Sequence, residues 1–233
     1  MLYVVATPIG NLEDISARAL RVLREADVIA CEDTRRTWQL LTHFEIPRPR
    51  AIVSYREQNE QRQSERLADE LAAGAIVALC TDGGYPGISD PGYRLLRLAA
   101  QRGLPVQVIP GPSAVSVALL TSGLSTASYT FKGFPPKKSG GLKRFFEEER
   151  ESPHTLVYFE SPFRVGKSLD AALAVLGDRE AAVCMELTKK FERVARGHLA
   201  SLAVDFAATH VKGEVTIVIA GNNPKFLRSA PES

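Results

Sequence analysis

Charged side chains follow directly after one of the apolar runs of the sequence, in the segment CEDTR. A carboxylate can accept a proton from a hydroxyl nucleophile, and a guanidinium can hold a phosphate through two parallel hydrogen bonds. We therefore expect Asp33 or Glu32 to act as a proton acceptor and Arg35 to hold a phosphate. Glu32 and Arg35 are also typical of a structural ion pair or a helix-capping set, and the sequence leaves this alternative open. Glu186 and Lys189, in the second half of the chain, are further candidates.

A loop rich in glycine and proline, TDGGYPGISDPG, follows the fourth apolar run. Similar loops, TPIGN and PGPSA, follow the first and fifth runs. Because ligands lie outside the carboxyl ends of the strands in an α/β sheet, we expect the three loops at one ligand-binding rim. Glycine lets backbone approach a ligand closely, although glycine and proline also make tight turns without any ligand. The chain contains neither GxGxxG nor GxxxxGK[ST], and these loops carry little charge, so a neutral or zwitterionic small molecule fits better than a triphosphate.

A basic segment, FKGFPPKKSGGLKR, covers residues 131–144. Clustered lysines in such a loop can order around RNA phosphates, but they are also typical of a solvated mobile loop. Phe131 and Phe134 flank the lysines and either stack on a flipped base or end a strand in the core. The segments TRR and RPR add positive charge to the expected rim, and Trp38 is expected to be a packing residue. The candidate RNA-binding residues of the basic segment are Lys132, Lys137, Lys138, Lys143 and Arg144.

The composition is that of an ordinary globular protein, with 233 residues of which 45% are hydrophobic and 24% charged. The net charge of +2 is too small to indicate nucleic-acid binding by itself. Cys31, Cys80 and Cys184 lie in apolar runs without a CxxC pair, which predicts reduced core residues of a cytoplasmic protein. The histidines are scattered, so no metal site is expected. No signal-peptide pattern or membrane-spanning run is visible, which also predicts a cytoplasmic location without a membrane.

Strand and helix patterns alternate along the chain, which predicts two consecutive α/β domains with the cleft between them as the ligand site. We expect one domain over residues 1–112, a second over 113–224 and a polar tail over 225–233. An almost wholly apolar helix marks the junction, and such a helix is expected to be buried between layers or between domains. Asp14 is the expected N-cap of the first helix. The expected helices cover residues 14–26, 34–44, 59–74, 93–102, 163–176 and 199–208.

Five segments in this order resemble the tetrapyrrole methylase family: TPIGNLEDIS with ADVIACEDTR, TDGGYPGISDPGYRL, IPGPSAV, ELTKKFE and KGEVTIVI. Within that superfamily, the first of these segments is most similar to the bacterial enzymes that methylate the 2'-hydroxyl of a cytidine in 16S rRNA. The resemblance covers residues 2–221. It implies two consecutive αβα domains of the class III methyltransferase type, S-adenosylmethionine bound between them, a homodimer, and the rRNA of the small ribosomal subunit as substrate.

The resemblance also implies which residues contact the cofactor. The chain departs from the family at one of them, because Tyr85 replaces the threonine of the usual Ser-Asp-Ala-Gly-Thr-Pro pattern. The tyrosine either stacks on the cofactor or alters the pocket. The implied cofactor contacts are Pro8, Gly10, Gly84, Tyr85, Ile88, Gly111, Ser113, Ala114, Met185, Gly213 and Glu214.

Two other functions remain open. A methyltransferase acting on a small tetrapyrrole would share the fold and the cofactor loops, but would not need the basic segment. A non-enzymatic α/β binding module is disfavoured, because three glycine-rich loops are expected to converge with charged residues at one rim.

Overall fold

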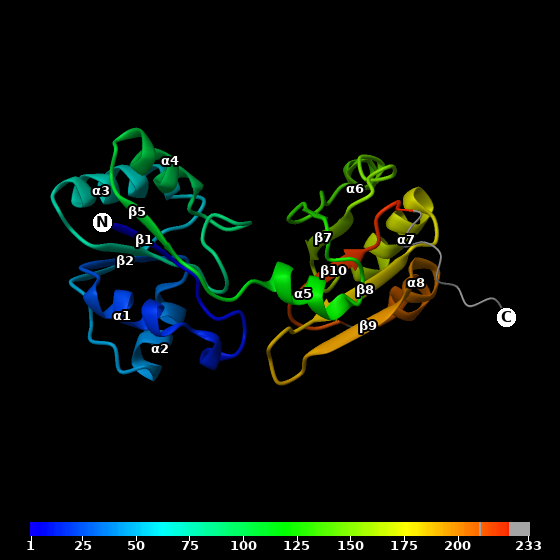
Figure 1. The fold of residues 1–233 in the computed structure, drawn as a ribbon, viewed down its shortest axis with the longest axis horizontal. Coiled ribbons are helices and arrows are strands. Elements are labelled where there is room, and N and C mark those ends of the chain that lie inside the picture. The colour runs from blue at the N-terminus through cyan, green and yellow to red at the C-terminus, as the bar shows by residue number, and fades with distance from the viewer. Residues whose placement is uncertain (210, 224–233) are drawn as a thin grey trace. The chain divides into compact units, whose positions relative to one another are not determined.

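The structure is a computed structural model that describes residues 1–209 and 211–223. The chain divides into two compact units, Met1–Ser113 and Ala114–Ser233, each with its own sheet and hydrophobic core (Figure 1). The sequence prediction placed this boundary after residue 112. The predicted polar tail, 225–233, lies outside the described residues.

Unit 1 contains a five-stranded sheet in the order β3-β2-β4-β1-β5, and all of its strands are parallel. The strands are short, and the three inner strands, β2, β4 and β1, are apolar and largely buried, which is typical of a parallel sheet covered by helices. The carboxyl ends of the strands therefore meet at one rim. The elements of unit 1 are β1 (Leu2–Val5), η1 (Leu12–Asp14), α1 (Ala17–Glu25), β2 (Val28–Cys31), α2 (Thr34–His43), β3 (Ala51–Ser54), α3 (Glu60–Ala72), β4 (Val77–Leu79), α4 (Tyr93–Gln101) and β5 (Val106–Ile109).

Helices cover both faces of the unit 1 sheet (Figure 1). On one face, Leu23 of α1 and Leu41 of α2 share a core cluster with Ile29 of β2. On the other face, Leu67 of α3 and Leu95 of α4 belong to a second cluster. Each leucine removed from water in this way contributes about 1.5–3 kcal/mol. The predicted αβα layering is therefore confirmed for this unit.

The first helix begins later than the sequence predicted. Asp14 lies in the short helix η1, whose preceding residue Asn11 accepts a hydrogen bond from the backbone N–H of Glu13 at 3.1 Å. The hydroxyl of Ser16 then accepts from the N–H of Ala19 at 3.1 Å and caps α1. The prediction of Asp14 as N-cap was wrong because two capping turns follow each other at this point.

Unit 2 contains a five-stranded sheet in the order β6-β7-β10-β8-β9, in which only the β6–β7 pair is parallel among the described strands. Helices α6, α7 and α8 supply one face of its core, and α5 packs on the strands from the other side (Figure 1). The elements of unit 2 are α5 (Ala114–Ser122), β6 (Tyr129–Phe131), α6 (Ser139–Glu147), β7 (Thr155–Glu160), α7 (Val165–Leu176), β8 (Glu180–Met185), β9 (Arg193–His198), α8 (Leu199–Ala207) and β10 (Val215–Ile219).

Helix α5 is the apolar helix that the sequence predicted to be buried. Its residues Ala118 and Leu119 are buried, and the backbone carbonyl of Ala118 lies 3.9 Å from the thiol of Cys184 in β8. Leu120, however, is 72% exposed, so the prediction holds for one side of the helix only. All three cysteines are buried and free, as predicted.

Two elements of unit 2 were not predicted. Helix α6 occupies the second half of the basic segment, which the sequence analysis treated as a loop, because Leu142, Phe145 and Phe146 form an apolar stripe at helical spacing that packs into the core. Strand β9 pairs with β8 at the edge of the sheet, and it is polar and largely exposed, so it lacks the apolar alternation that marks a strand.

Candidate functional site

The loops after β1 and β4 are joined by backbone pairing at the rim of unit 1. Thr7 and Gly84 exchange two hydrogen bonds, with N···O distances of 3.0 and 2.9 Å. The buried hydroxyl of Thr7 also donates to the carbonyl of Thr81 at 2.9 Å. The first loop and the glycine loop therefore form a single, internally fixed surface, as their shared position at the rim predicted.

Tyr85 connects the glycine loop to the loop after β5. Its hydroxyl accepts a hydrogen bond from the backbone N–H of Gly111 at 3.0 Å. A Cβ atom at position 111 would lie 3.0 Å from the Cβ of Ala6 and 3.2 Å from its carbonyl oxygen. The close approach of the loop after β5 to the segment after β1 therefore depends on glycine. Three loops of the rim are thus tied together through backbone groups.

The far end of the glycine loop is held by a carboxylate from a neighbouring helix. Glu60 of α3 accepts hydrogen bonds from the backbone N–H groups of Gly92 and Arg94, at 3.0 and 3.2 Å, and so caps α4 in place of a local side chain. Gly92 has φ +155°, and a Cβ there would lie 2.7 Å from the nitrogen of Gly87. Ile88 lies half exposed between these anchors, which leaves an apolar side chain at the loop surface.

Asp33 and Arg35 pair with each other at the start of α2. The Asp33 carboxylate accepts from the backbone N–H of Arg35 at 2.9 Å and from its guanidinium at 3.1 and 2.7 Å. The side-chain hydrogen bond from Arg35 holds the pKa of Asp33 well below its usual range. A carboxylate with so low a pKa is a weak proton acceptor. The structure thus shows a capping ion pair in this segment, but Arg35 forms it with Asp33 and not with Glu32 as the sequence alternative had it. The catalytic role of these residues stays a prediction.

Glu32 faces a second carboxylate, Asp82, which the sequence analysis did not select. The hydroxyl of Thr81 donates to Glu32 at 3.1 Å, and Asp82 accepts from the N–H of Asp33 at 3.1 Å and lies 3.3 Å from the guanidinium of Arg36. Burial and then the charge of Glu32 raise the pKa of Asp82. A raised pKa makes a carboxylate a better base near neutral pH. In the sequence, Asp82 could have been selected from its position in the loop that follows β4.

Unit 2 brings together four of the predicted residues. The carboxylate of Glu186 accepts from the ammonium of Lys189 at 2.8 Å and from the N–H of Glu214 at 2.9 Å, and Lys189 also lies 3.2 Å from the Glu214 carboxylate. Burial alone would raise the pKa of Glu186, but the bonds from Lys189 and the Glu214 N–H outweigh it and lower that pKa. A Cβ at Gly213 would overlap the carboxyl group of Glu186, so this cluster requires glycine there.

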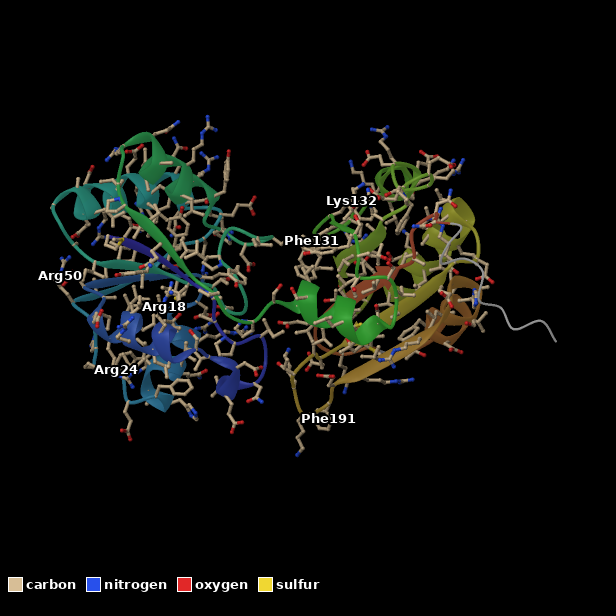
Figure 2. The ribbon with its side chains drawn as sticks, in the orientation of Figure 1. Arg18, Arg24, Arg50, Phe131, Lys132 and Phe191 are labelled. Carbon is tan, nitrogen blue, oxygen red and sulfur yellow. The ribbon has the colours of Figure 1, made fainter. Side chains whose placement is uncertain are left out.

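Lys132 is a partly buried, bonded residue rather than a free surface lysine. Its ammonium donates to the carboxylate of Glu148 at 2.6 Å and to the carbonyl of Phe145 at 3.2 Å, and it lies 3.3 Å from Glu149. The side chain is only 18% exposed, and Figure 2 labels it beside α6. Lys132 therefore fixes α6, and its predicted contact with RNA stays a prediction. The other basic residues of the segment are exposed: Lys137, Lys138, Lys143 and Arg144.

The two phenylalanines of the basic segment share an aromatic cluster. The rings of Phe131 and Phe134 lie 4.9 and 5.4 Å from the ring of Phe159, measured between centroids. Phe131 is partly buried, whereas Phe134 is 60% exposed. Phe134 thus has free surface on which a base could stack.

Among residues 1–209 and 211–223, no group of three or more His, Cys, Asp or Glu side chains is placed to hold a metal ion. Within the same residues, no helix has the length and apolar character needed to cross a membrane.

The family model for the tetrapyrrole (corrin/porphyrin) methylases matches residues 1–203. The chain belongs to this family. It is 45% identical over 96% of its length to the ribosomal RNA small subunit methyltransferase I of Halalkalibacterium halodurans, of which it covers 77%. The corresponding protein of Thermotoga maritima is 38% identical, with 94% of this chain and 98% of the relative covered. The uroporphyrin-III C-methyltransferase of Thermus thermophilus, solved with S-adenyl homocysteine, shares the fold at 21% identity, with a TM-score of 0.63 over 94% of this chain and 96% of that one.

In this tetrapyrrole methylase, the remaining residues that the resemblance implies for cofactor binding differ from one another in burial and in the unit to which they belong. Pro8 is buried and Gly10 exposed in the loop after β1. Ser113 ends unit 1, and Ala114 begins α5 and unit 2. Met185 ends β8 with its side chain buried in the core of unit 2, so its backbone is the part left to meet a ligand.

Proposed function

We propose that the chain is an S-adenosylmethionine-dependent methyltransferase that modifies the 2'-hydroxyl of a cytidine in the 16S rRNA of the small ribosomal subunit. The observation that carries this proposal is the similarity, at 45% identity over 96% of the chain, to a relative named ribosomal RNA small subunit methyltransferase I. The cytidine and its 2'-hydroxyl come from the resemblance of the TPIGNLEDIS and CEDTR segments to that branch of the family.

The character of the rim loops fits a sulfonium amino-acid cofactor. They offer backbone groups, the exposed apolar side chain of Ile88 and a close backbone approach at Gly111, and their TPIGN, TDGGYPGISDPG and PGPSA segments contain no lysine for a triphosphate. When bound, S-adenosylmethionine supplies a methyl group on a good leaving group. The residues proposed to hold it are those of the rim loops, Pro8, Gly10, Gly84, Tyr85, Ile88, Gly111 and Ser113, with Ala114, Met185, Gly213 and Glu214 of unit 2.

The residues at the start of α2 and in the glycine loop would then hold the nucleotide and accept the proton of its 2'-hydroxyl. The hydroxyl oxygen would form its bond to the methyl carbon as the bond from that carbon to sulfur breaks and the neutral thioether leaves. The hydroxyl proton would pass to a carboxylate, and Glu32 and Asp82 form the pair best suited to accept it. Asp33 was an equal candidate from the sequence, but its bond to Arg35 makes it the weaker base. The exposed Arg35 remains free at its outer edge to hold a phosphate. Correct orientation of two reacting groups supplies about 7–11 kcal/mol of the barrier reduction.

The RNA would meet the exposed part of the basic segment, which includes Lys137 and Lys138. The proposal further includes a homodimer, implied by the resemblance, and the cytoplasm, where ribosomal subunits are found. The edge strand β5 leaves Val106 and Val108 exposed, which is compatible with such a partner.

The experiment that tests the proposal is a methyl-transfer assay with small ribosomal subunits that lack the modification. The purified chain is mixed with them and with S-adenosylmethionine carrying a labelled methyl group. Label in the rRNA that protects one linkage from alkaline cleavage would establish ribose methylation and locate the nucleotide. Absence of label in the rRNA, together with transfer to uroporphyrinogen or a precorrin, would replace the proposal by the tetrapyrrole alternative.

A further inference from the structure

Trp38 is the only tryptophan of the chain, and its side chain is 42% exposed on α2. The sequence predicted a packing residue at this position, but much of the side chain lies in solvent. Helix α2 packs through Thr37 and Leu41, one helical turn apart on its buried face. Trp38 lies beside that face rather than on it, so a large aromatic surface remains in solvent without a packing function to explain it.

Two arginines contribute positive charge to this part of the surface. The guanidinium carbon of Arg48 lies 5.8 Å from the centroid of the Trp38 ring, within the range of a cation–π contact. Arg35 precedes Trp38 by three residues on the same helix, and its side chain is 84% exposed beyond its bond to Asp33. Helix α2 contains no aspartate or glutamate. Arg35, Trp38 and Arg48 are referred to below as the Trp38 surface.

The backbone beneath the Trp38 surface is fixed at the end of α2. The guanidinium of Arg24 on α1, labelled in Figure 2, donates to the carbonyl of Phe44 at 3.1 Å. The N–H of Ile46 donates to the carbonyl of Leu41 at 2.8 Å. These bonds hold the turn that leads to Arg48. Less conformational freedom is therefore lost when a ligand binds on this surface.

We propose that the Trp38 surface binds an unpaired nucleotide of the RNA substrate, with the base stacked on the indole ring and a phosphate held by Arg48. This inference rests on the proposed function, and it adds a second contact region to the basic segment. Every base has a face that stacks on an aromatic ring, and a guanidinium matches a phosphate with two hydrogen bonds. The absence of carboxylates on α2 favours a polyanion over a protein partner.

The position of the surface agrees with that assignment. Asp33 caps the start of α2, and Trp38 follows five residues later, which is about 7 Å along the helix axis. A nucleotide on Trp38 would therefore neighbour the one presented to Glu32 and Asp82. The Trp38 surface would thus help to select which ribose reaches the carboxylates.

The sole tryptophan makes the inference directly measurable. The full chain is titrated with a single-stranded, cytidine-rich RNA oligonucleotide carrying a fluorophore, while its anisotropy and the Trp38 emission are followed. We expect RNA to quench the Trp38 emission and to protect the ring from acrylamide. Trp38→Ala should weaken RNA binding roughly tenfold, and Trp38→Phe should retain part of the affinity.

Two arginines of one segment provide a matched comparison. Arg48→Gln should weaken RNA binding and reduce the slope of log affinity against log salt by about 0.7. Arg50→Gln removes the same charge from a side chain that is bound to Glu70 at 2.7 Å, and it should leave the slope unchanged. Arg50 is labelled in Figure 2. Circular dichroism of each variant confirms that the fold is retained.

The other outcomes separate this inference from the proposed function. If RNA binds with unchanged Trp38 emission, and Trp38→Ala binds as well as the parent chain, the inference is overturned while the proposed function stands. If the parent chain binds neither the oligonucleotide nor small subunit rRNA, both fail. If it binds the rRNA but not the oligonucleotide, only the inference is overturned. If Trp38→Ala changes the sedimenting mass instead of RNA affinity, the surface is a protein interface and the inference is overturned.

Discussion

The hydroxyl of Tyr85 accepts a hydrogen bond from the backbone N–H of Gly111 at 3.0 Å, which joins the loop after β4 to the loop after β5. Tyr85 stands where the related family pattern has a threonine, and a threonine side chain is shorter than this span. The sequence left open whether the tyrosine stacks on the cofactor or alters the pocket. In the structure it links two of the loops that are proposed to hold the cofactor.

Tyr85→Phe should loosen this link. The substitution removes the acceptor and leaves the partly buried N–H of Gly111 without it, which costs about 1 kcal/mol of the free energy of unfolding. We expect a lower midpoint of thermal unfolding and weaker binding of S-adenosylmethionine by calorimetry. Tyr93→Phe is the matched control, because Tyr93 is largely exposed on α4. Equal behaviour of the two variants would show that the Tyr85 hydroxyl does not support the loops.

Gly111→Ala should separate β1 from the loop after β5. The new Cβ would lie 3.0 Å from the Cβ of Ala6 and 3.2 Å from its carbonyl oxygen, closer than ordinary contact. Such overpacking lowers the free energy of unfolding by about 1–3 kcal/mol. Urea unfolding of the full chain measures the loss. Gly140→Ala is the control, since no atom lies within 4 Å of the added carbon and alanine favours helix α6, so it should be neutral or stabilising. A neutral Gly111→Ala would mean that the loop shifts freely.

Asp82 and Asp33 should differ in their effect on the pH dependence of methyl transfer. Burial and the nearby Glu32 raise the pKa of Asp82, whereas Arg35 lowers that of Asp33. A base is active only when deprotonated, so the rate should rise with pH through the raised pKa of Asp82. Asp82→Asn should lower the single-turnover rate on the order of 100-fold and remove this acid limb. Asp33→Asn should keep the limb, and asparagine should still cap α2. The reverse pattern would identify Asp33 as the acceptor.

The contrast between these two aspartates shows which features of the site could be predicted from the sequence and which could not. The strands of unit 1 were predictable because apolar residues buried on both faces leave a continuous signal, and the loops after them followed from parallel topology. The raised pKa of Asp82 was not predictable, because it depends first on burial at the folded rim and then on the charge of Glu32, 50 positions earlier in the chain. Strand β9 was not predicted for the opposite reason. It is an edge strand that is stabilised by pairing with β8, and its own polar residues show no pattern that indicates this pairing.

The ion-pair cluster of unit 2 should stabilise the protein at neutral pH and cease to do so in acid. The pKa of Glu186 is lowered in the folded state, so its contribution is present above the unfolded value, about 4.3, and is lost as the pH falls through the folded value. Glu186→Gln should therefore reduce the urea midpoint at neutral pH, with the difference from the parent chain shrinking in acid. Glu147→Gln breaks only an exposed pair with Lys143 and should change little at either pH. A pH-independent loss for Glu186→Gln would indicate a packing effect.

Charge reversal of Lys137 and Lys138 should weaken RNA binding without unfolding unit 2. Both side chains are exposed, and a glutamate at position 138 would stand at the N-cap of α6, where negative charge is favourable. The double variant should lose affinity for the small subunit rRNA, and its slope of log affinity against log salt should fall by about 1.4 if each lysine meets one phosphate.

Two comparisons make this last prediction specific. Arg62→Glu with Arg66→Glu introduces the same charge change on the exposed side of α3 and should weaken binding less. Lys132→Ala should instead lower the midpoint of thermal unfolding, because the ammonium holds α6 through Glu148 and the carbonyl of Phe145. If methylation survives the Lys137 and Lys138 reversal at full rate and moderate salt, the exposed lysines are not part of the RNA-binding surface. The Trp38 surface would then be the remaining proposed contact with the RNA.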